Sequence, residues 1–469
     1  MKGASRVAPL SFVDPPGGEP PHNRRTRFST CMMRRRLACP QARSVRRSAI
    51  TSLESTTARA RPTSLWRNRD FLLLWTGQAV SAAGTEVALL AYPLLVLALT
   101  HSPAQAGFVG ALRALPYAIL CLPVGALVDR WDRKRVMILC DSGCAVALGS
   151  IPLALAFNRL SLAQIYVVAL VEGILFVFFN LANTACLPRI VPPEQLPVAV
   201  SRTYVAFNLA FLLGPLAGGS LFAVSHALPF LLDALSFGAS ALATSGIRAR
   251  FQGERGAQRR PLRVEIAEGL GWLWRRPLIR FLMLFITLQN LLTASMPLIV
   301  IVLAQRQQAS SATVGSILAF AGVGGIVGAL VAPLLQRRFG FARSFLAALW
   351  LFVAAWPLIA LAPSLAALAL VGAVVLLMWN AFDMLQFSYR LRLIPDALQG
   401  RVNSVYRLGA YGGQSLGLAL GGVLVQQLGV GITVFVLGAG LLGLTTLMTV
   451  APYVRAAAPH PHMEGLRSG

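Results

Sequence analysis

Long apolar segments, repeated along most of the chain, constrain the fold more than any other feature of this sequence. From Phe71 onward, apolar runs alternate with short polar breaks, and a run of about 18 or more apolar residues is typical of a helix that spans a bilayer. Only 13% of the residues are charged, against about 25% in soluble proteins. The sequence therefore predicts an all-α membrane protein with twelve transmembrane helices. The predicted spans are 71–99, 106–128, 136–157, 162–187, 201–224, 228–247, 278–303, 312–335, 344–362, 365–388, 402–427 and 430–452.

Basic residues divide unevenly between alternate connectors of these spans. One set of connectors holds 22 Lys or Arg residues, nine of them between Arg248 and Arg280, whereas the other set holds only Arg159 and Arg306. Basic loops stay on the cytoplasmic side of a membrane. The division therefore predicts a multi-pass protein of the cell membrane with both termini in the cytoplasm.

The spans and the charges together predict five regions. Residues 1–65 carry 13 Lys or Arg against three acids and lack apolar periodicity, which predicts a disordered basic tail. Residues 66–247 and 278–453 are the expected six-helix halves, 248–277 the expected cytoplasmic central loop, and 454–469 a cytoplasmic tail. Because the net charge of +25 lies in tails and connectors, it indicates topology and not nucleic-acid binding.

The sequence lacks residues that several kinds of site would require, and this excludes those functions. Lysine occurs only at Lys2 and Lys134, so the sequence has no Gly-Lys-Ser/Thr phosphate loop for ATP. All five histidines lie in tails or short connectors, which leaves no ligands for a haem or a metal within the membrane. We expect no cofactor and no enzymatic activity. The expected partners are the lipid bilayer, a small-molecule substrate and protons as the coupling ion, and we expect a monomer.

An internal repeat supports two halves of the same fold. The tetrapeptide at Gly125 recurs at Gly328, the string Arg-Ile-Val-Pro at Arg189 recurs as Arg-Leu-Ile-Pro at Arg392, and a glycine pattern recurs in the eleventh span, each at an offset of 203 residues. Six helices separate equivalent positions, so the repeats run parallel and are related by an axis along the membrane normal. This arrangement predicts a central cavity between the halves.

The loop after the second span resembles a signature of the major facilitator superfamily. The stretch Gly-Ala-Leu-Val-Asp-Arg-Trp-Asp-Arg-Lys-Arg departs from the superfamily pattern at Asp132, where a glycine is usual. The alternative is an ordinary basic cytoplasmic loop. The residues of the expected conformational loop motif are Gly125, Asp129, Arg130, Arg133, Lys134 and Arg135.

The fifth span carries Gly214, Pro215, Gly218 and Gly219, which resemble the helix motif of proton-coupled exporters in the same superfamily. A glycine-rich packing surface is the alternative interpretation. Further strings between about residues 66 and 452 resemble the subgroup that contains macrolide-efflux proteins and the enterobactin exporter. The resemblance implies the major facilitator fold and export of a drug or siderophore by alternating access, driven by proton entry. Import on the same fold, or a receptor or assembly partner without transport activity, remain alternatives.

Ionisable residues within the spans are few, and such residues are costly enough in a membrane to be functional candidates. The candidates for proton coupling are Glu172, Glu86, Asp233 and Asp383. Counting along the helices places Glu86 and Arg113 at similar depths, so Arg113 is a candidate for an ion pair with Glu86. Glu172 lies near the midplane and is the first choice as proton carrier, because an unpaired carboxyl there favours its protonated form. The alternative is that Glu172 only hydrogen-bonds between helices.

Polar or amphipathic residues in otherwise apolar spans are candidates for the wall of a substrate cavity. They are Asn180, Asn183, Asn208, Gln289, Asn290, Trp379, Asn380 and Gln414. The excess of Leu, Ala, Val and Phe around them favours a hydrophobic or amphiphilic solute. For each residue taken singly, a hydrogen bond between helices is the alternative interpretation.

Overall fold

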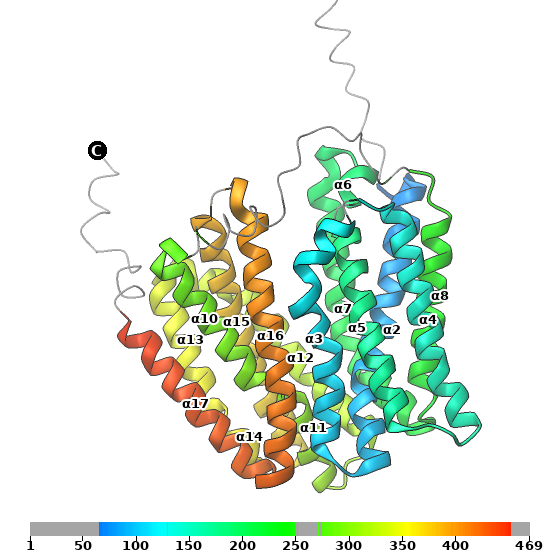
Figure 1. Ribbon diagram of the computed structural model, residues 1–469. Helices are drawn as coiled ribbons and strands as arrows, with labels where there is room; N and C mark the ends of the chain where they lie inside the picture. The colour runs from blue at the N-terminus through cyan, green and yellow to red at the C-terminus, as the bar shows by residue number, and fades with distance from the viewer. Residues whose placement is uncertain are drawn as a thin grey trace, which may run out of the picture. The chain divides into compact units, whose positions relative to one another are not determined.

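The described part of the chain is helical almost throughout, as its apolar runs predict (Figure 1). The computed structural model describes residues 65–128, 130–184, 186–249, 251, 271, 274–394 and 396–451, all within one compact unit, Pro62–Gly469. Twelve helices in these residues are long and apolar enough to cross a membrane, which confirms the predicted number. The expected tails and most of the central loop lie outside the described residues.

The first half supplies six of the spanning helices, drawn in blue to green in Figure 1. Its elements are η1 (Leu65–Arg67), α2 (Arg69–Thr100), α3 (Pro103–Val128), α4 (Arg133–Ala156), α5 (Leu162–Thr184), α6 (Leu187–Ile190), η2 (Pro193–Gln195), α7 (Leu196–Val224) and α8 (Leu228–Ser245). The second half consists of α10 (Pro277–Thr293), α11 (Met296–Arg306), α12 (Ser311–Phe339), α13 (Phe341–Ala355), α14 (Leu358–Leu361), α15 (Leu365–Leu393), α16 (Asp396–Leu428) and α17 (Val430–Val450).

Two predicted spans of the second half are each broken into two helices. The span predicted at 278–303 is divided between α10 and α11, and the span at 344–362 between α13 and α14. Pro297 and Pro357 lie at the starts of the second pieces. Proline has no N–H for the preceding turn, and its ring clashes with a carbonyl four residues back. A prediction from hydropathy alone does not detect such breaks in a helix.

The helices of each half pack mainly on one another, and two pairs make the main contacts between the halves. In the first half α2 packs against α7 and α8, α3 against α5, and α4 against α5 and α8. In the second half α12 and α13 pack against α15, and α10 packs against α16 and α17. The main contacts between halves are those of α3 with α16 and of α7 with α12, and α3 also makes a smaller contact with α11.

Glycines allow the backbones of the two halves to touch at both of these crossings. A side chain at Gly107 would meet the backbone of Gly422, and one at Gly315 would meet that of Gly219. Gly219 and Gly422 are separated by the 203 residues of the predicted repeat, so the two crossings are equivalent. Small residues at helix crossings permit this close approach in membranes.

The equivalence of these crossings corrects one of the three sequence matches. Gly107 and Gly315, which occupy the same place in the two crossings, are 208 residues apart and not 203. Gly125 lies three residues before the end of α3, whereas Gly328 lies eleven residues before the end of α12. The match of the tetrapeptides at Gly125 and Gly328 was therefore a chance identity, although the repeat itself holds.

We name the two ends of the bundle by their charge. The basic end contains Arg130, Lys134, Arg189 and Arg248, and the opposite end contains His101, Arg159 and Arg306. Helices α2, α4 and α7 begin at the basic end, whereas α3, α5 and α8 begin at the opposite end. These directions fix the depth at which each buried polar residue lies.

Candidate functional site

A buried ion pair lies in the interior of the first half. The guanidinium of Arg113, on α3, contacts the carboxylate of Glu172, on α5, with 2.7 Å between Nη2 and Oε1. Its Nε also donates to Oε1, at 2.8 Å. The hydroxyl of Tyr92, on α2, donates to the other carboxylate oxygen, Oε2, at 2.9 Å. Both oxygens of Glu172 are thus paired, and its side chain is only 3% exposed.

This pairing corrects two expectations. Glu172 is not an unpaired carboxyl, and the ion pair of Arg113 is with Glu172 instead of Glu86. Arg113 and Glu172 each lie ten residues after the start of helices that begin at the same end, which is a depth of about 15 Å for both. Gly173 allows α5 to approach the backbone of Arg113. The acid on the packed neighbouring helix therefore takes the arginine, because an unpaired buried charge is costly.

Glu86 points toward a different neighbour on α7. It is partly buried, and a side chain at Gly214 would meet its backbone and its Cβ. Arg113 still lies near enough to act electrostatically on its carboxyl. Glu86 therefore lies at the edge of the buried cluster and not within its ion pair.

Asp233, on α8, is a second fully buried acid near this pair. Its Oδ1 accepts from the hydroxyl of Ser236 at 3.2 Å, whereas its Oδ2 is buried and has no hydrogen-bond partner. Its carboxyl interacts electrostatically with both Glu172 and Arg113. The first half therefore places two buried carboxyls near one guanidinium.

A polar and aromatic contact connects this cluster to the second half. Arg407, on α16, donates from Nη1 to the hydroxyl of Tyr117 at 2.9 Å and to Oδ1 of Asn180 at 3.4 Å. The ring of Tyr117 stacks on that of Tyr411, with centroids 4.0 Å apart. Of these residues only Asn180 was a predicted site residue. Arg407 was assigned to a connector, but it lies eleven residues inside α16; its depth in that helix was the signal that could have identified it.

Asp383, the remaining acid candidate, lies apart from the cluster in the second half. On α15 it interacts electrostatically with Arg390, seven residues further along the same helix. The guanidinium of Arg390 lies over the ring of Tyr406, 4.1 Å from its centroid. The structure therefore separates Asp383 from the other three candidates.

The predicted cavity residues do not form one group. Asn183 exchanges two hydrogen bonds with Gln78 on α2, at 2.5 and 3.0 Å. Three amides instead donate to carbonyls one turn back in their own helices: Asn208, Asn290 and Asn380. Gln289 is buried with an unpartnered Nε2, Trp379 packs against the hydrophobic core, and Gln414 is partly buried on α16.

The loop motif combines capping with a contact between helices. Asp132, which replaces the usual glycine, caps α4 by accepting from the backbone N–H groups of Lys134 and Arg135 at 2.9 and 3.3 Å. The ammonium of Lys134 donates to the carbonyl of Ser245, the last residue of α8, at 2.9 Å and to that of Ile247 just beyond it at 2.6 Å. A side chain at Gly125 would meet none of the described atoms, Arg130 is exposed, and Asp129 lies outside the described residues. Arg133 begins α4.

The glycines of the helix motif face two neighbours of α7. Side chains at Gly214 and Gly218 would meet Glu86 and the backbone of Val87 on α2, whereas one at Gly219 would meet Gly315 on α12. Pro215 also approaches Gly315 through its carbonyl. The motif therefore packs α7 within its own half and against the other half.

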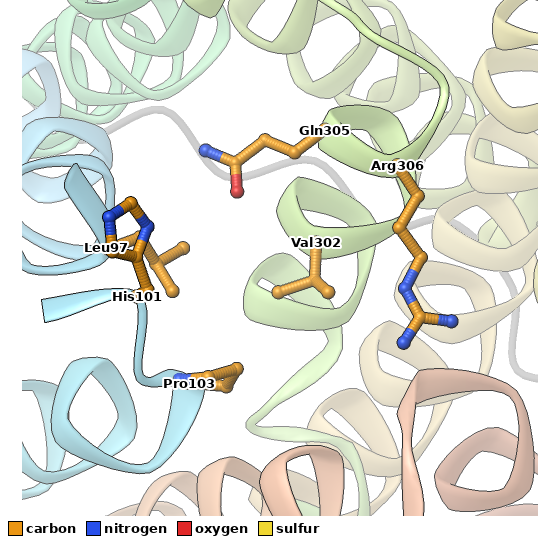
Figure 2. A pocket seen from close by; sticks show the side chains of 6 residues that line it. All are labelled: Leu97, His101, Pro103, Val302, Gln305 and Arg306. Carbon is orange, nitrogen blue, oxygen red and sulfur yellow. The ribbon is translucent and has the colours of Figure 1, made fainter.

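A separate hollow of about 260 Å³ opens at the opposite end of the bundle. Figure 2 shows that α2 and the start of α3 line one side and α11 lines the other; the lining residues are Leu97, His101, Pro103, Val302, Gln305 and Arg306. The hollow therefore lies between the two halves, away from the buried ion pair. None of its residues was predicted as a site.

Twelve membrane-spanning helices in two repeated halves, with ionisable side chains buried between them, define a membrane transporter of the major facilitator superfamily. The chain matches the family described as transmembrane secretion effectors over residues 60–463. It belongs to this family.

Named relatives and solved structures agree with this assignment. The chain is 27% identical to the multidrug efflux pump Tap of Mycolicibacterium fortuitum, covering 82% of this chain and 96% of the pump. It is 28% identical to macrolide efflux protein A of Streptococcus pyogenes over 33% of this chain and 38% of that protein. The crystal structure of the nucleoside transporter NupG shares the fold at a TM-score of 0.68 and 13% identity, covering 83% of this chain and 99% of NupG.

Proposed function

We propose that this protein exports hydrophobic or amphiphilic small molecules by alternating access, driven by proton entry. Its relatives named multidrug efflux pump, at 27–28% identity over about four fifths of the chain, support a drug-like cargo and export. The basic end faces the cytoplasm in this proposal, because basic residues are retained on that side. The protein works as a monomer, with the path for the cargo between its two halves.

The buried cluster supplies groups that can carry a proton. Glu172 and Asp233 share a single guanidinium, that of Arg113, and one positive charge offsets one carboxylate. A second charged carboxyl in a low-dielectric interior is costly. Proton uptake by Glu172 would release Arg113 from the ion pair, and the charge of Arg113 would then offset that of the Asp233 carboxylate. Glu172 is therefore the proposed proton carrier, with Asp233 as its partner in exchange and Glu86 at the edge of the cluster.

The observation that carries the proposal is that the ion pair and the contact between halves share the same two helices. On α3, Arg113 lies one turn before Tyr117, and on α5, Glu172 lies two turns before Asn180. Arg407 of the second half binds both Tyr117 and Asn180. A change in the Arg113–Glu172 pair therefore acts on the two helices that hold Arg407, which gives protonation a direct route to the interface between halves.

Alternating access requires that the halves close one end and then the other. The Gly107–Gly422 crossing lies near the start of α3 and the end of α16, and the Gly219–Gly315 crossing near the end of α7 and the start of α12. All four positions belong to the opposite end, where these contacts hold the halves together. In the proposed cycle the crossings separate when the cargo is released.

Transport into everted membrane vesicles tests this function. Vesicles that contain the protein should accumulate a lipophilic dye such as Nile red when a proton gradient is imposed, and an uncoupler should abolish accumulation. The Glu172→Gln variant should lose accumulation by about 100-fold, as expected for a positioned proton carrier. The matched control is Glu194→Gln, which changes an exposed glutamate of η2. Accumulation that needs ATP but no proton gradient would refute the mechanism, and dye movement in the reverse direction would indicate an importer.

A further inference from the structure

One face of α8 is polar although it is buried among helices. Asp233, Ser236, Ser240 and Thr244 are spaced by three, four and four residues, so they share one face of the helix. Asp233 is 0% exposed and Ser240 1% exposed. We call these four residues, with Asp141 of α4, the polar seam.

Helix α2 leaves room for this seam. A side chain at Gly84 would meet Asp233 and Ser236, and one at Gly77 would meet Ser240 and Ala243. Gly77 and Gly84 are seven residues apart and therefore lie on the same face of α2. Buried Ser81 lies between them and adds a hydroxyl to the wall.

Helix α4 contributes a carboxyl nearer the basic end. Asp141 is 1% exposed, and the hydroxyl of Ser240 faces its carboxyl. Neither Oγ of Ser240 nor Oδ2 of Asp141 has a hydrogen-bond partner in the structure. Cys144, one turn further along α4, interacts electrostatically with Asp141, Asp233 and Glu172, so its thiol lies within electrostatic reach of all three carboxyls.

The seam extends from the ion pair toward the basic end. Asp233, Ser236 and Ser240 lie twelve, nine and five residues before the end of α8, which corresponds to depths of about 18, 13 and 8 Å. Asp141 lies eight residues after the start of α4, a depth of about 12 Å. The titratable or charged groups on the elements around the seam include Glu86, Tyr92, Arg113, Lys134, Cys140, Cys144 and Glu172.

The second half shows that the fold does not need a polar seam. At an offset of 204 residues, six of the eight buried positions of α8 fall on buried positions of α17; the exceptions are Ala234 and Ser236, which fall on the partly buried Gly438 and Gly440. At this offset the position of Asp233 is taken by Leu437, that of Ser240 by Leu444 and that of Thr244 by Met448. At the offset of 208 that relates α4 to α13, buried Leu349 stands for Asp141. Equivalent packing is thus achieved with leucine and methionine, and burying the unpaired polar groups of α8 costs free energy without improving the packing.

We propose that the polar seam conducts protons between Glu172 and the basic end, with Asp141 as the last carboxyl of the path. This inference rests on the proposed proton-coupled function. Each carboxyl releases the proton that it takes up, and each hydroxyl accepts one proton while it donates its own. Rotation of the hydroxyls about their C–O bonds then returns the path to its starting state. In this path Ser236 follows Asp233 toward the basic end, and Ser240, one turn further along α8, lies beside Asp141.

Reconstitution into liposomes with a pH-sensitive dye inside tests this path, with ethidium as the transported probe. In Asp141→Asn, which keeps the shape of the side chain, gradient-driven accumulation of ethidium should fall by about 10-fold or more. Exchange of ethidium for labelled ethidium needs no proton transfer through the seam and should continue. Asp141→Glu should restore part of the accumulation. Ser240→Ala should reduce accumulation less, and the control Ser344→Ala, a buried serine of α13, should not change it.

The outcomes separate the seam from the proposed function. If the unmodified protein shows no proton-coupled transport of ethidium, both ideas are overturned. Coupled transport in the unmodified protein that persists in Asp141→Asn and in Ser240→Ala overturns the seam alone. If Asp141→Asn fails to fold, Ser240→Ala provides the test of the polar seam. Unchanged accumulation of ethidium in Ser240→Ala would then overturn the proposed path.

Discussion

The two halves of this transporter have the same helices and the same glycine crossings, yet their interiors differ in chemistry. The first half buries Glu172 and Asp233 near Arg113, and it buries a third acid, Asp141, closer to the basic end. Among the described residues of the second half, Phe285, Phe345, Phe352, Phe382 and Trp356 are fully buried, and the buried polar side chains, such as that of Gln289, are uncharged apart from Arg390. Its own acid, Asp383, has Arg390 as an electrostatic neighbour.

The difference separates what the fold needs from what the function needs. Features present in both halves, such as the crossings at Gly107–Gly422 and Gly219–Gly315, are explained by packing. Charged groups present in one half alone are not required for packing, because the equivalent helices of the other half pack without them. The four predictions below test this division.

Removal of Arg113 should have the largest effect on stability. In Arg113→Leu the carboxylate of Glu172 loses its charged partner, and breaking a buried ion pair in this way costs about 3–5 kcal/mol. The double variant Arg113→Leu with Glu172→Leu should recover much of the loss, because it resembles the apolar interior of the second half. Thermal unfolding in detergent measures both, with exposed Arg159 changed to Leu as the control. A double variant no more stable than the single one would contradict the comparison.

Neutralising one acid in each half should separate their roles in transport. Glu172→Gln should lower proton-driven efflux by about 100-fold, whereas Asp383→Asn should lower it by about threefold or less, the range of a change that leaves the proton carrier intact. Dye efflux driven by an imposed proton gradient gives both values. Equal losses in the two variants would mean that coupling is distributed over both halves.

The glycine crossings should be equally sensitive in the two halves. Gly422→Ala and Gly219→Ala each force a methyl group against a neighbouring backbone, and overpacking of this kind costs about 1–3 kcal/mol. Gly443→Ala, at a helical position with open space, should be neutral or stabilising, because alanine favours helices by up to about 1 kcal/mol. Melting temperatures of the three variants test the equivalence, which unequal losses at Gly422 and Gly219 would disprove.

The smallest predicted effect concerns the start of α4. Asp132 caps this helix, whereas α13, its equivalent in the second half, begins after Gly340 without a side-chain cap. Asp132→Ala should therefore cost about 1 kcal/mol, while Gly340→Ala acts through its φ of +79° and not through a lost cap. Chemical denaturation with far-ultraviolet circular dichroism measures the cost, and an unchanged midpoint for Asp132→Ala would show that the cap does not stabilise the helix.

The sequence predicts the number and approximate ends of the helices because a hydrophobic span is a local property of the chain. Partner choice is not local. Glu86, Glu172 and Arg113 all lie at middle depth, and only the packing of α3 against α5 decides which acid meets the arginine. Most residues of these helices are apolar on every face, so the sequence gives little indication of which face meets which neighbour.

Short repeated strings were a second source of error. A four-residue match of Gly, Ala, Leu and Val is weak evidence in a sequence rich in these residues, and the match of Gly125 with Gly328 did not correspond to equivalent places in the structure. The glycines at 219 and 422 did correspond, because backbone contact restricts those positions to glycine. The repeated glycines, which steric contact requires, therefore indicated equivalent positions reliably. The repeated string of common apolar residues did not.

The contact of Lys134 with the carbonyls at the end of α8 has a practical consequence for chemical labelling. Lysine occurs at only two positions of the whole sequence, Lys2 and Lys134, so an amine-reactive reagent meets a single lysine in the helical part of the chain. The ammonium of that lysine is held by Ser245 and Ile247. The rate at which a reagent modifies it therefore reports how often α4 and α8 separate at the basic end, and a cargo that alters this motion would change the rate.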